Sequence, residues 1–157
     1  MRLEIRAIGR IKAGPERVLI DDYLERAGVQ GRNLGLGPAS EREIDPRTLK
    51  TRAAETGALM SDIEPGAAIM VLDETGAALS SAEMAQWIKT ARDDGVRQAV
   101  FLIGGAEGHA REALPTGARR VSFGKATWPH RLVRVMLAEQ IYRAVSIIAG
   151  TPYHREG

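Results

Sequence analysis

The sequence predicts an α/β protein in which a mostly parallel sheet carries helices on both faces. Strand-like and helix-like segments alternate along the 157 residues, and this alternation favours a parallel sheet. Two runs of strand length, 67–72 and 99–103, are unbroken and apolar, which is typical of strands covered on both faces. Because the length suits one compact domain with a sizeable core, we expect a single domain over residues 1–157.

The first half of the chain contains two helix starts. Pro15 suits the first turn of a helix, because a helix leaves the N–H groups of that turn without partners. Asp45 and Pro46 form a cap and a first-turn residue in the same way. The elements expected here are a strand over 3–8, a helix over 15–27, a short strand around 32–36, a helix over 45–59 and a strand over 67–72.

The second half has sharper boundaries. Ser80 and Glu83 have the spacing of a capping box, in which each side chain accepts from the other residue's backbone N–H. Gly150 ends the last helix, and Pro152 follows it. The elements expected here are a helix over 80–93, a strand over 99–103, a short helix over 109–114, a strand over 119–123 and a helix over 129–149.

Three loops should form the ligand-binding edge of this sheet. Ligands of open parallel sheets bind beyond the carboxyl ends of the strands, where the loops after Leu72, Ile103 and Phe123 would meet. The second of these, 104–108, is rich in glycine, which lets backbone approach a ligand closely. The third leads into a helix N-terminus, whose free N–H groups suit a carboxylate or a purine edge. Tight structural turns, with His130 as a hydrogen-bonded structural histidine, explain the same residues.

Positive charge gathers at the end of the chain. Residues 109–157 carry 8 Lys and Arg against 3 Asp and Glu, whereas residues 1–108 carry 14 against 17. Arginine outnumbers lysine 18 to 4, and arginine is the better bidentate partner for phosphate. Arginine-rich codon usage would explain that ratio but not the clustering. The pattern therefore indicates a nucleic-acid or phosphate-bearing partner.

Composition and missing motifs exclude several classes. The sequence has no cysteine, so disulfides, thiolate metal sites and cysteine nucleophiles are excluded. Carboxylates and histidines do not share metal-ligand spacing, and we expect no metal. No apolar run approaches the roughly 20 residues of a membrane helix, so we expect no membrane partner. Residues 1–5 enter a strand pattern without the apolar core of a signal peptide, which predicts a cytoplasmic protein.

The last helix predicts a homodimer. It has two apolar faces, and in a chain this small one of them is expected to pack on the sheet and the other on a second copy. Glu139 and Arg143 lie four residues apart in the order that favours an ion pair. The two faces consist of Val133, Leu137, Ile141, Val145 and Ile148, and of Leu132, Val135, Met136 and Tyr142.

The segment 150–157 contains several side chains suited to binding or catalysis, whereas chain ends are usually polar and frayed. Tyr153, His154 and Arg155 place an aromatic ring, an imidazole and a guanidinium in consecutive positions just after the helix stop. A solvated tail is one interpretation of this segment. A catalytic or RNA-binding tail is the other.

Four segments together resemble one protein family. They are FLIGGAEG at 101–108, TWPH at 127–130, LVRVMLAEQIYRA at 132–144 and PYHR at 152–155. These segments resemble the RlmH family of the SPOUT superfamily, whose members methylate N3 of a pseudouridine in large-subunit ribosomal RNA. The likeness spans the chain and is loosest at 28–60.

This resemblance implies more than the pattern does. It implies a deep trefoil knot and a pocket for S-adenosylmethionine within about 68–150, a homodimer with composite sites, and a substrate in the assembled ribosome. By position, the cofactor site would comprise Leu72, Gly104, Gly105, Gly124, Lys125, Ala126, Thr127, Trp128 and Pro129. The knot could not be expected from the pattern, because chain connections rarely thread through loops.

The resemblance also implies roles in catalysis for five residues. His154 would act as the base or proton relay at N3, and Tyr153 would stack on or hydrogen-bond the target base. Arg143 and Arg155 would hold phosphate or favour the deprotonated imide, with Glu139 orienting Arg143.

Two other interpretations remain open from the pattern. The chain could be a non-catalytic RNA- or ribosome-binding module, which the basic end supports equally well. It could also be a small enzyme acting on a phosphorylated metabolite, with Gly104, Gly105 and the helix start at Pro129 as an anion site. Binding of S-adenosylmethionine separates the methyltransferase from both.

Overall fold

The computed structural model describes residues 1–155, in which the strands form a five-stranded sheet of order β2-β1-β4-β3-β5. All neighbouring strands are parallel, as predicted. The strands are β1 (Arg2–Ile8), β2 (Ala39–Ile44), β3 (Ala68–Ala78), β4 (Gln98–Ile103) and β5 (Arg119–Ser122), and the helices are α1 (Pro15–Gly31), α2 (Arg52–Met60), α3 (Ser81–Asp93) and α4 (His130–Ala149).

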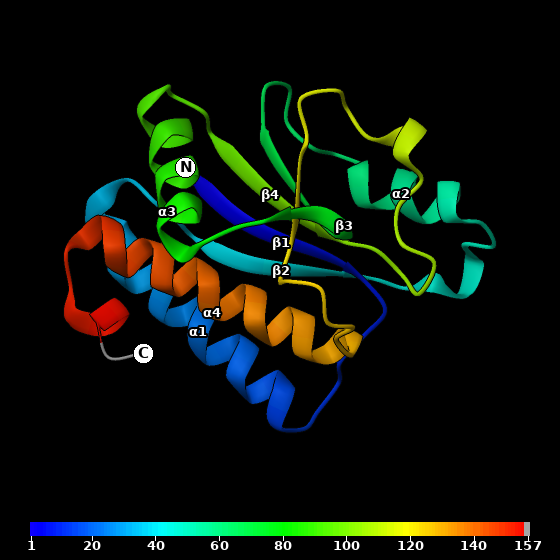
Figure 1. The fold of residues 1–157 in the computed structure, drawn as a ribbon, viewed down its shortest axis with the longest axis horizontal. Helices are drawn as coiled ribbons and strands as arrows, with labels where there is room; N and C mark the ends of the chain where they lie inside the picture. Colours follow the sequence, from blue (N-terminus) through cyan, green and yellow to red (C-terminus); the bar gives the residue numbers. More distant parts are fainter. Residues whose placement is uncertain (156–157) are drawn as a thin grey trace.

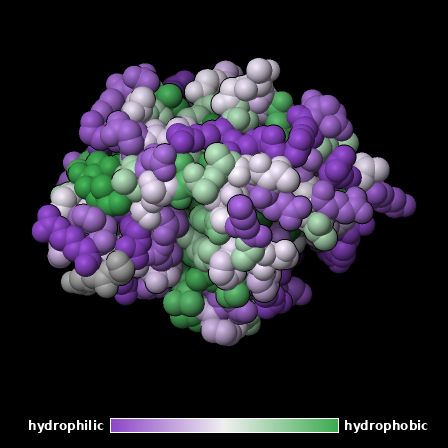
Figure 2. Space-filling view, viewed as in Figure 1, coloured by the Kyte–Doolittle hydropathy of each residue, from purple (hydrophilic) through white to green (hydrophobic). Residues whose placement is uncertain are grey.

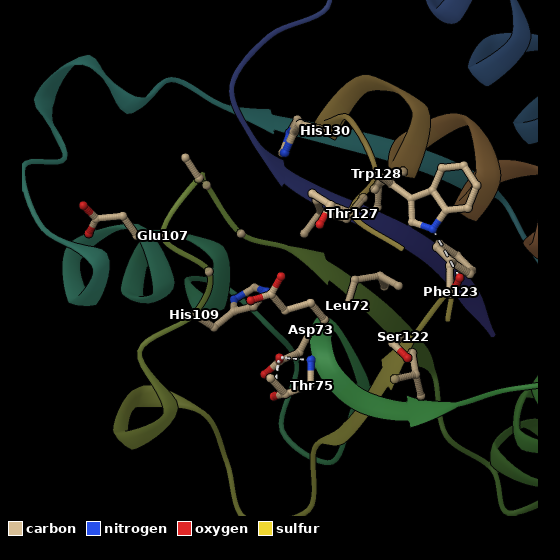
Figure 3. A pocket seen from close by; sticks show the side chains of 18 of the residues that line it. Leu72, Asp73, Thr75, Glu107, His109, Ser122, Phe123, Thr127, Trp128 and His130 are labelled. Atoms are coloured by element: carbon tan, nitrogen blue, oxygen red, sulfur yellow. Dashed lines mark hydrogen bonds between the residues drawn. The ribbon is translucent and has the colours of Figure 1, made fainter. Parts of the chain in front are cut away.

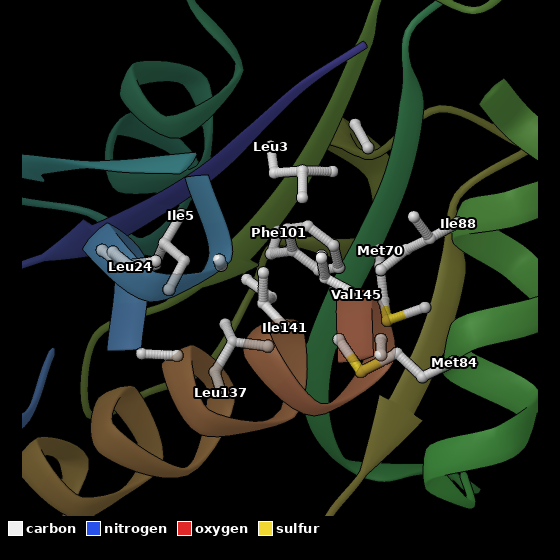
Figure 4. Packing of buried hydrophobic residues seen from close by; sticks show 14 of the residues in the cluster. Leu3, Ile5, Leu24, Met70, Met84, Ile88, Phe101, Leu137, Ile141 and Val145 are labelled. Atoms are coloured by element: carbon white, nitrogen blue, oxygen red, sulfur yellow. The ribbon is translucent and has the colours of Figure 1, made fainter. Parts of the chain in front are cut away.

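Helices cover both faces of this sheet (Figure 1). Side chains alternate between the faces of a strand, and in β4 Phe101 faces α1, α3 and α4 whereas Val100 and Leu102 face α2. Every residue of β4 is buried, which explains its unbroken apolar run. Figure 4 shows the larger cluster, in which Phe101 and Met70 of the sheet meet side chains of the three helices.

The predicted helix ends are largely confirmed. The Ser80 hydroxyl accepts from the Glu83 N–H at 3.2 Å, and the Glu83 carboxylate accepts from the Ser80 N–H at 2.8 Å, which completes the capping box. Pro15 stands in the first turn of α1. Gly150 ends α4 in the left-handed conformation, at φ 72°, which glycine adopts without steric cost.

The stretch 28–60 is where the predicted elements are wrong. Residues 32–34 form a 3-10 turn, and the strand lies at 39–44 instead. This strand is at the sheet edge and is mostly polar, so it lacks an apolar pattern. Asp45 caps only a 3-10 turn, and α2 starts at a second cap, Thr51, whose hydroxyl accepts from the Ala54 N–H at 3.1 Å.

Smaller differences occur elsewhere. The first helix continues to Gly31, and the short helix expected at 109–114 is a 3-10 turn over Arg111–Ala113. None of the helices within residues 1–155 is both long enough and apolar enough to span a membrane.

Candidate functional site

A cavity of about 600 Å³ opens at the carboxyl ends of β4 and β5 and beside residues 72–75 of β3. The loops after Ile103 and Ser122 line it as predicted, whereas residues 73–75, expected in a loop after Leu72, lie within β3 (Figure 3). The volume lies within the range of small-molecule sites.

The structure brings most of the predicted cofactor residues together. Seven of them line the cavity: Leu72, Gly104, Gly105, Gly124, Ala126, Thr127 and Trp128. Lys125 and Pro129 belong to the same loop but do not line it. At Gly124 and Gly108, a Cβ atom would point into open space, and both residues have positive φ angles of 94° and 73°. At these two glycines the pocket wall is therefore main chain, with open space beside it.

The glycine-rich loop is fixed at both ends. The Gly108 N–H donates to the Gly105 carbonyl at 3.0 Å and closes a tight turn. The Ala110 N–H donates to the Thr56 hydroxyl of α2 at 2.9 Å, and Thr56 is fully buried. A Cβ on Gly104 would lie only 3.0 Å from the Gly108 backbone, so a larger residue there would have to displace the turn.

The polar wall of the pocket was not predicted. β3 and β5 change register between Leu72 and Ala77, and residues 73–75 reach the cavity at this irregularity. Asp73 accepts from the Thr75 N–H at 2.9 Å, and Arg120 Nη2 lies 2.8 Å from Asp73 Oδ2. The sequence offered one signal, since Asp73 directly follows the apolar strand.

Asp73 is held in its charged form. Its partial burial opposes ionisation, but hydrogen bonds from Thr75 and Arg120 outweigh that effect and lower the pKa of Asp73. The pocket wall beside β3 therefore holds an Asp73–Arg120 ion pair, in which the two charges offset each other.

His109 also lines the cavity and was not among the predicted site residues. Its side chain is only 7% exposed, and neither ring nitrogen has a hydrogen-bond partner. Burial lowers the pKa of His109, although the nearby Asp73 carboxylate opposes this shift. The ring is therefore neutral at pH 7.

His130 is a hydrogen-bonded histidine on the pocket wall, which is the structural interpretation of that residue. Its Nε2 lies 3.3 Å from both Nε and Nη2 of Arg134. A guanidinium only donates, so Nε2 must accept and carry no proton. Burial, together with the Arg134 charge, lowers the pKa of His130.

Arg134 connects the start of α4 to β1 and β2. Its side chain is 1% exposed. Its Nη1 lies 3.1 Å from Glu41 Oε1 and 2.7 Å from Glu43 Oε2, and its Nη2 donates to the carbonyls of Ile8 at 3.0 Å and Gly9 at 2.6 Å. This cluster fixes the helix N-terminus that follows the pocket loop.

Three of the five predicted catalytic residues meet at the other end of α4. Arg143 Nε donates to Glu139 Oε1 at 2.8 Å, and the Tyr153 hydroxyl donates to the same oxygen at 3.1 Å. The Arg143 guanidinium lies 4.9 Å from the centroid of the Tyr153 ring. Burial raises the pKa of Tyr153, and the neighbouring Tyr23 and Glu139 raise it further, so the phenol keeps its proton.

The other two predicted catalytic residues, His154 and Arg155, belong to the 3-10 turn Pro152–Arg155. His154 Nδ1 lies 3.1 Å from the Thr151 carbonyl, and Arg155 is exposed. None of the five lines the large cavity, although Glu139 lines a smaller hollow that shares Phe123 with it. Within one chain, the predicted catalytic cluster and the predicted cofactor site are therefore separate.

In the part of the chain that the structure describes, His, Asp and Glu side chains form no group of three or more that could hold a metal ion. The fold and the pocket thus define the class of protein: a parallel α/β domain with a glycine-containing site for a small molecule at the carboxyl edge of its sheet. A family model described as predicted SPOUT methyltransferase matches residues 1–154.

Proteins of similar sequence match this chain over nearly its full length. Ribosomal RNA large subunit methyltransferase H of Maricaulis maris is 58% identical over 156 residues, covering 99% of this chain and 100% of that protein. The proteins of the same name from Hyphomonas neptunium and Dinoroseobacter shibae are 50% and 48% identical, each covering 99% of both chains. The chain belongs to the SPOUT methyltransferase family and, within it, to the family of ribosomal RNA large subunit methyltransferase H.

Proposed function

We propose that this protein uses S-adenosylmethionine to methylate N3 of a pseudouridine in large-subunit ribosomal RNA, acting on the assembled ribosome in the cytoplasm. The observation that carries the proposal is the glycine-containing pocket beside β3 and at the carboxyl ends of β4 and β5, in a chain whose full-length relatives are named ribosomal RNA methyltransferases.

The residues of this pocket fit such a cofactor. Open space beside the Gly108 and Gly124 backbone leaves room for a bound molecule. The unpartnered nitrogens of His109 are polar atoms that a ligand could satisfy. The Asp73 carboxylate, held by Thr75 and Arg120, offers hydrogen-bond acceptors at the cavity wall.

The chemistry divides between cofactor and protein. The bound cofactor supplies a methyl group that is already a strong electrophile. The protein must align the acceptor nitrogen and remove its proton. His154 is our candidate for the base or proton relay, and Tyr153 for contact with the target base. Arg155 would contact phosphate or the imide.

Glu139 is the positioning residue of this group. Its Oε1 accepts from both Arg143 and Tyr153, so one carboxylate holds a guanidinium from α4 and a phenol from the tail at fixed places. Arg143 can then favour the deprotonated imide by its charge.

A homodimer would unite the two halves of the site. The catalytic cluster does not line the cavity of its own chain, and large apolar side chains are exposed near both: Val18 at 67%, Leu19 at 43%, Trp128 at 42% and Leu132 at 42%. Figure 2 shows hydrophobic side chains reaching the surface over α1, at the lower edge of the view. Exposed apolar side chains of this kind are typical of an interface. In our proposal, a second copy covers them and brings its tail to the cavity.

The remaining parts of the proposal, the domain bounds and the knot, rest on membership of this family. We propose one methyltransferase domain over residues 1–157, with a trefoil knot and the cofactor pocket within about 68–150. The catalytic tail would comprise 151–157, of which 156 and 157 lie outside the described residues. Short segments after β4 and β5 that line one cavity support this division.

The test combines binding and product mapping. Calorimetry with S-adenosylmethionine should give saturable binding, and ribosomes that lack the modification should gain one methyl group on a pseudouridine when incubated with protein and labelled cofactor. Mass mapping of the ribosomal RNA locates that group. Absence of cofactor binding would favour a non-catalytic RNA-binding module instead.

A further inference from the structure

His109 is a buried polar side chain without a protein partner, at the wall of a ligand cavity. Its side chain is 7% exposed, and both ring nitrogens lack hydrogen bonds. Buried polar groups are nearly always paired, and leaving one unpaired lowers the stability of the folded state. Both nitrogens are shielded in the free protein, so a ligand in the cavity could supply the missing partner after a small rotation of the ring.

The ring is held in place before any ligand arrives. On one side, the position of a Cβ on Gly104 would lie 3.2 Å from the ring carbon Cε1, so the absence of a side chain at 104 makes space for the imidazole. On the other side, the next residue, Ala110, is hydrogen-bonded to buried Thr56 of α2.

The surroundings indicate what the ring would bind. The ring lies at the ends of β3 and β4, beside Asp73 (Figure 3). The main-chain carbonyls of Leu72 and Leu102 lie close enough to favour a proton on the ring, yet neither completes a hydrogen bond. A neutral imidazole offers one donor and one acceptor. A neutral hydroxyl or a ring nitrogen of a ligand matches this pair, whereas charged groups have the Asp73–Arg120 ion pair beside them.

We propose that His109 is a binding residue that hydrogen-bonds the nucleoside part of the cofactor, at a ribose hydroxyl or at the adenine edge. This inference rests on the proposed function, because it takes S-adenosylmethionine as the ligand. It assigns His109 to cofactor affinity and not to the transfer step, since the residue lies on the cofactor wall and away from the catalytic cluster of its own chain.

Two variants test this role through the melting temperature of the free protein and its affinity for a cofactor analogue. His109→Leu replaces an unpartnered polar ring by an apolar side chain of similar volume, so the melting temperature of the free protein should stay equal or rise. The Kd for S-adenosylhomocysteine, measured by calorimetry, should rise roughly tenfold, the value of about one hydrogen bond. His109→Asn keeps a donor and an acceptor and should recover part of that affinity. Glu112→Gln, an exposed change outside the cavity, is the matched control.

Ligand analogues locate the contact. If His109 binds a ribose hydroxyl, removing that hydroxyl from adenosine should weaken binding to wild type but not to His109→Leu, because each change removes the same bond. If it binds the adenine edge, N6-methylation should show this pattern instead. Either pattern supports the inference.

Three results would overturn it. Unchanged affinity of His109→Leu, while wild type binds the cofactor, would refute the role of His109 and leave the proposed function intact. A lower melting temperature with equal loss of all ligands would make His109 a structural residue. Failure of wild type to bind S-adenosylhomocysteine would refute the proposed function and this inference together.

Discussion

The Tyr153 hydroxyl donates to Glu139 Oε1 at 3.1 Å, which attaches the C-terminal tail to α4. The same oxygen accepts from Arg143. Residues fourteen positions apart along the chain thus form one cluster around a single carboxylate. Glu139 therefore holds the tail, whereas the sequence pattern links Glu139 only to Arg143.

The first prediction concerns this carboxylate. Glu139→Gln removes the charge that holds Arg143 and leaves a weaker acceptor for Tyr153. Methyl transfer to ribosomes should fall by at least about tenfold, since a charge-assisted hydrogen bond is worth roughly 1.5–3 kcal/mol. The Kd for S-adenosylmethionine should stay near the wild-type value, because Glu139 does not line the large cavity. Equal losses of transfer and cofactor binding would contradict the assigned role.

The second prediction concerns the glycine-rich loop. In Gly104→Val, the Cβ would lie 3.0 Å from the Gly108 backbone, so the turn must move. Cofactor affinity should fall by more than about tenfold, since main-chain groups of the pocket wall must reposition. Gly117→Ala is the control, because a Cβ there meets nothing within 4 Å. Calorimetry of both variants checks this. Unchanged affinity in Gly104→Val would place the cofactor elsewhere.

The third prediction concerns the buried guanidinium. Arg134→Met removes the partner of Glu43 and two carbonyls and leaves part of a buried carboxylate cluster uncompensated. The free energy of unfolding should fall by about 3–5 kcal/mol, as is typical when one member of a buried ion pair is lost. Denaturant titration measures it. Arg131→Met, an exposed neighbour on the same helix, should change stability little.

The fourth prediction is a loss of stability in mild acid. Burial is the largest cause of the lowered pKa values of His109 and His130. The unfolded chain, with histidine pKa values of about 6.5, then binds more protons than the folded one just below that pH. Stability must therefore decrease as the pH falls below about 6.5 and be fully present above it. Denaturant titrations at several pH values should show this slope, and His109→Leu should reduce it. A slope that is the same in both proteins would exclude His109 as a cause.

Much of the fold could be predicted because its signals are local. Apolar runs mark the buried strands β3 and β4, and the capping box at Ser80 marks the start of α3. The edge strand β2 could not be predicted, because its partners are distant in sequence. Glu41 and Glu43 pair with Arg134 at the other end of the chain.

The site was predictable to a similar degree. The loops after the strands could be placed from the parallel-sheet rule, and the glycines from their motif. Two residues of the pocket were not predicted. Asp73 lines it because the pairing of β3 with β5 changes register there, and His109 lines it because the preceding turn folds back on Gly104. The first depends on the pairing of two strands and the second on the geometry of a turn, and no local pattern reports either.

A mixing experiment tests the composite site most directly. His154→Ala should retain the cofactor pocket and lack the base, and Gly104→Val should retain the tail and lack the pocket. Each variant alone should methylate ribosomes poorly. Co-expressed in equal amounts, they should recover activity near about one quarter of wild type, because half of random dimers are mixed and each mixed dimer holds one intact site. Activity of the mixture no higher than that of the parent variants would contradict a site shared between two copies.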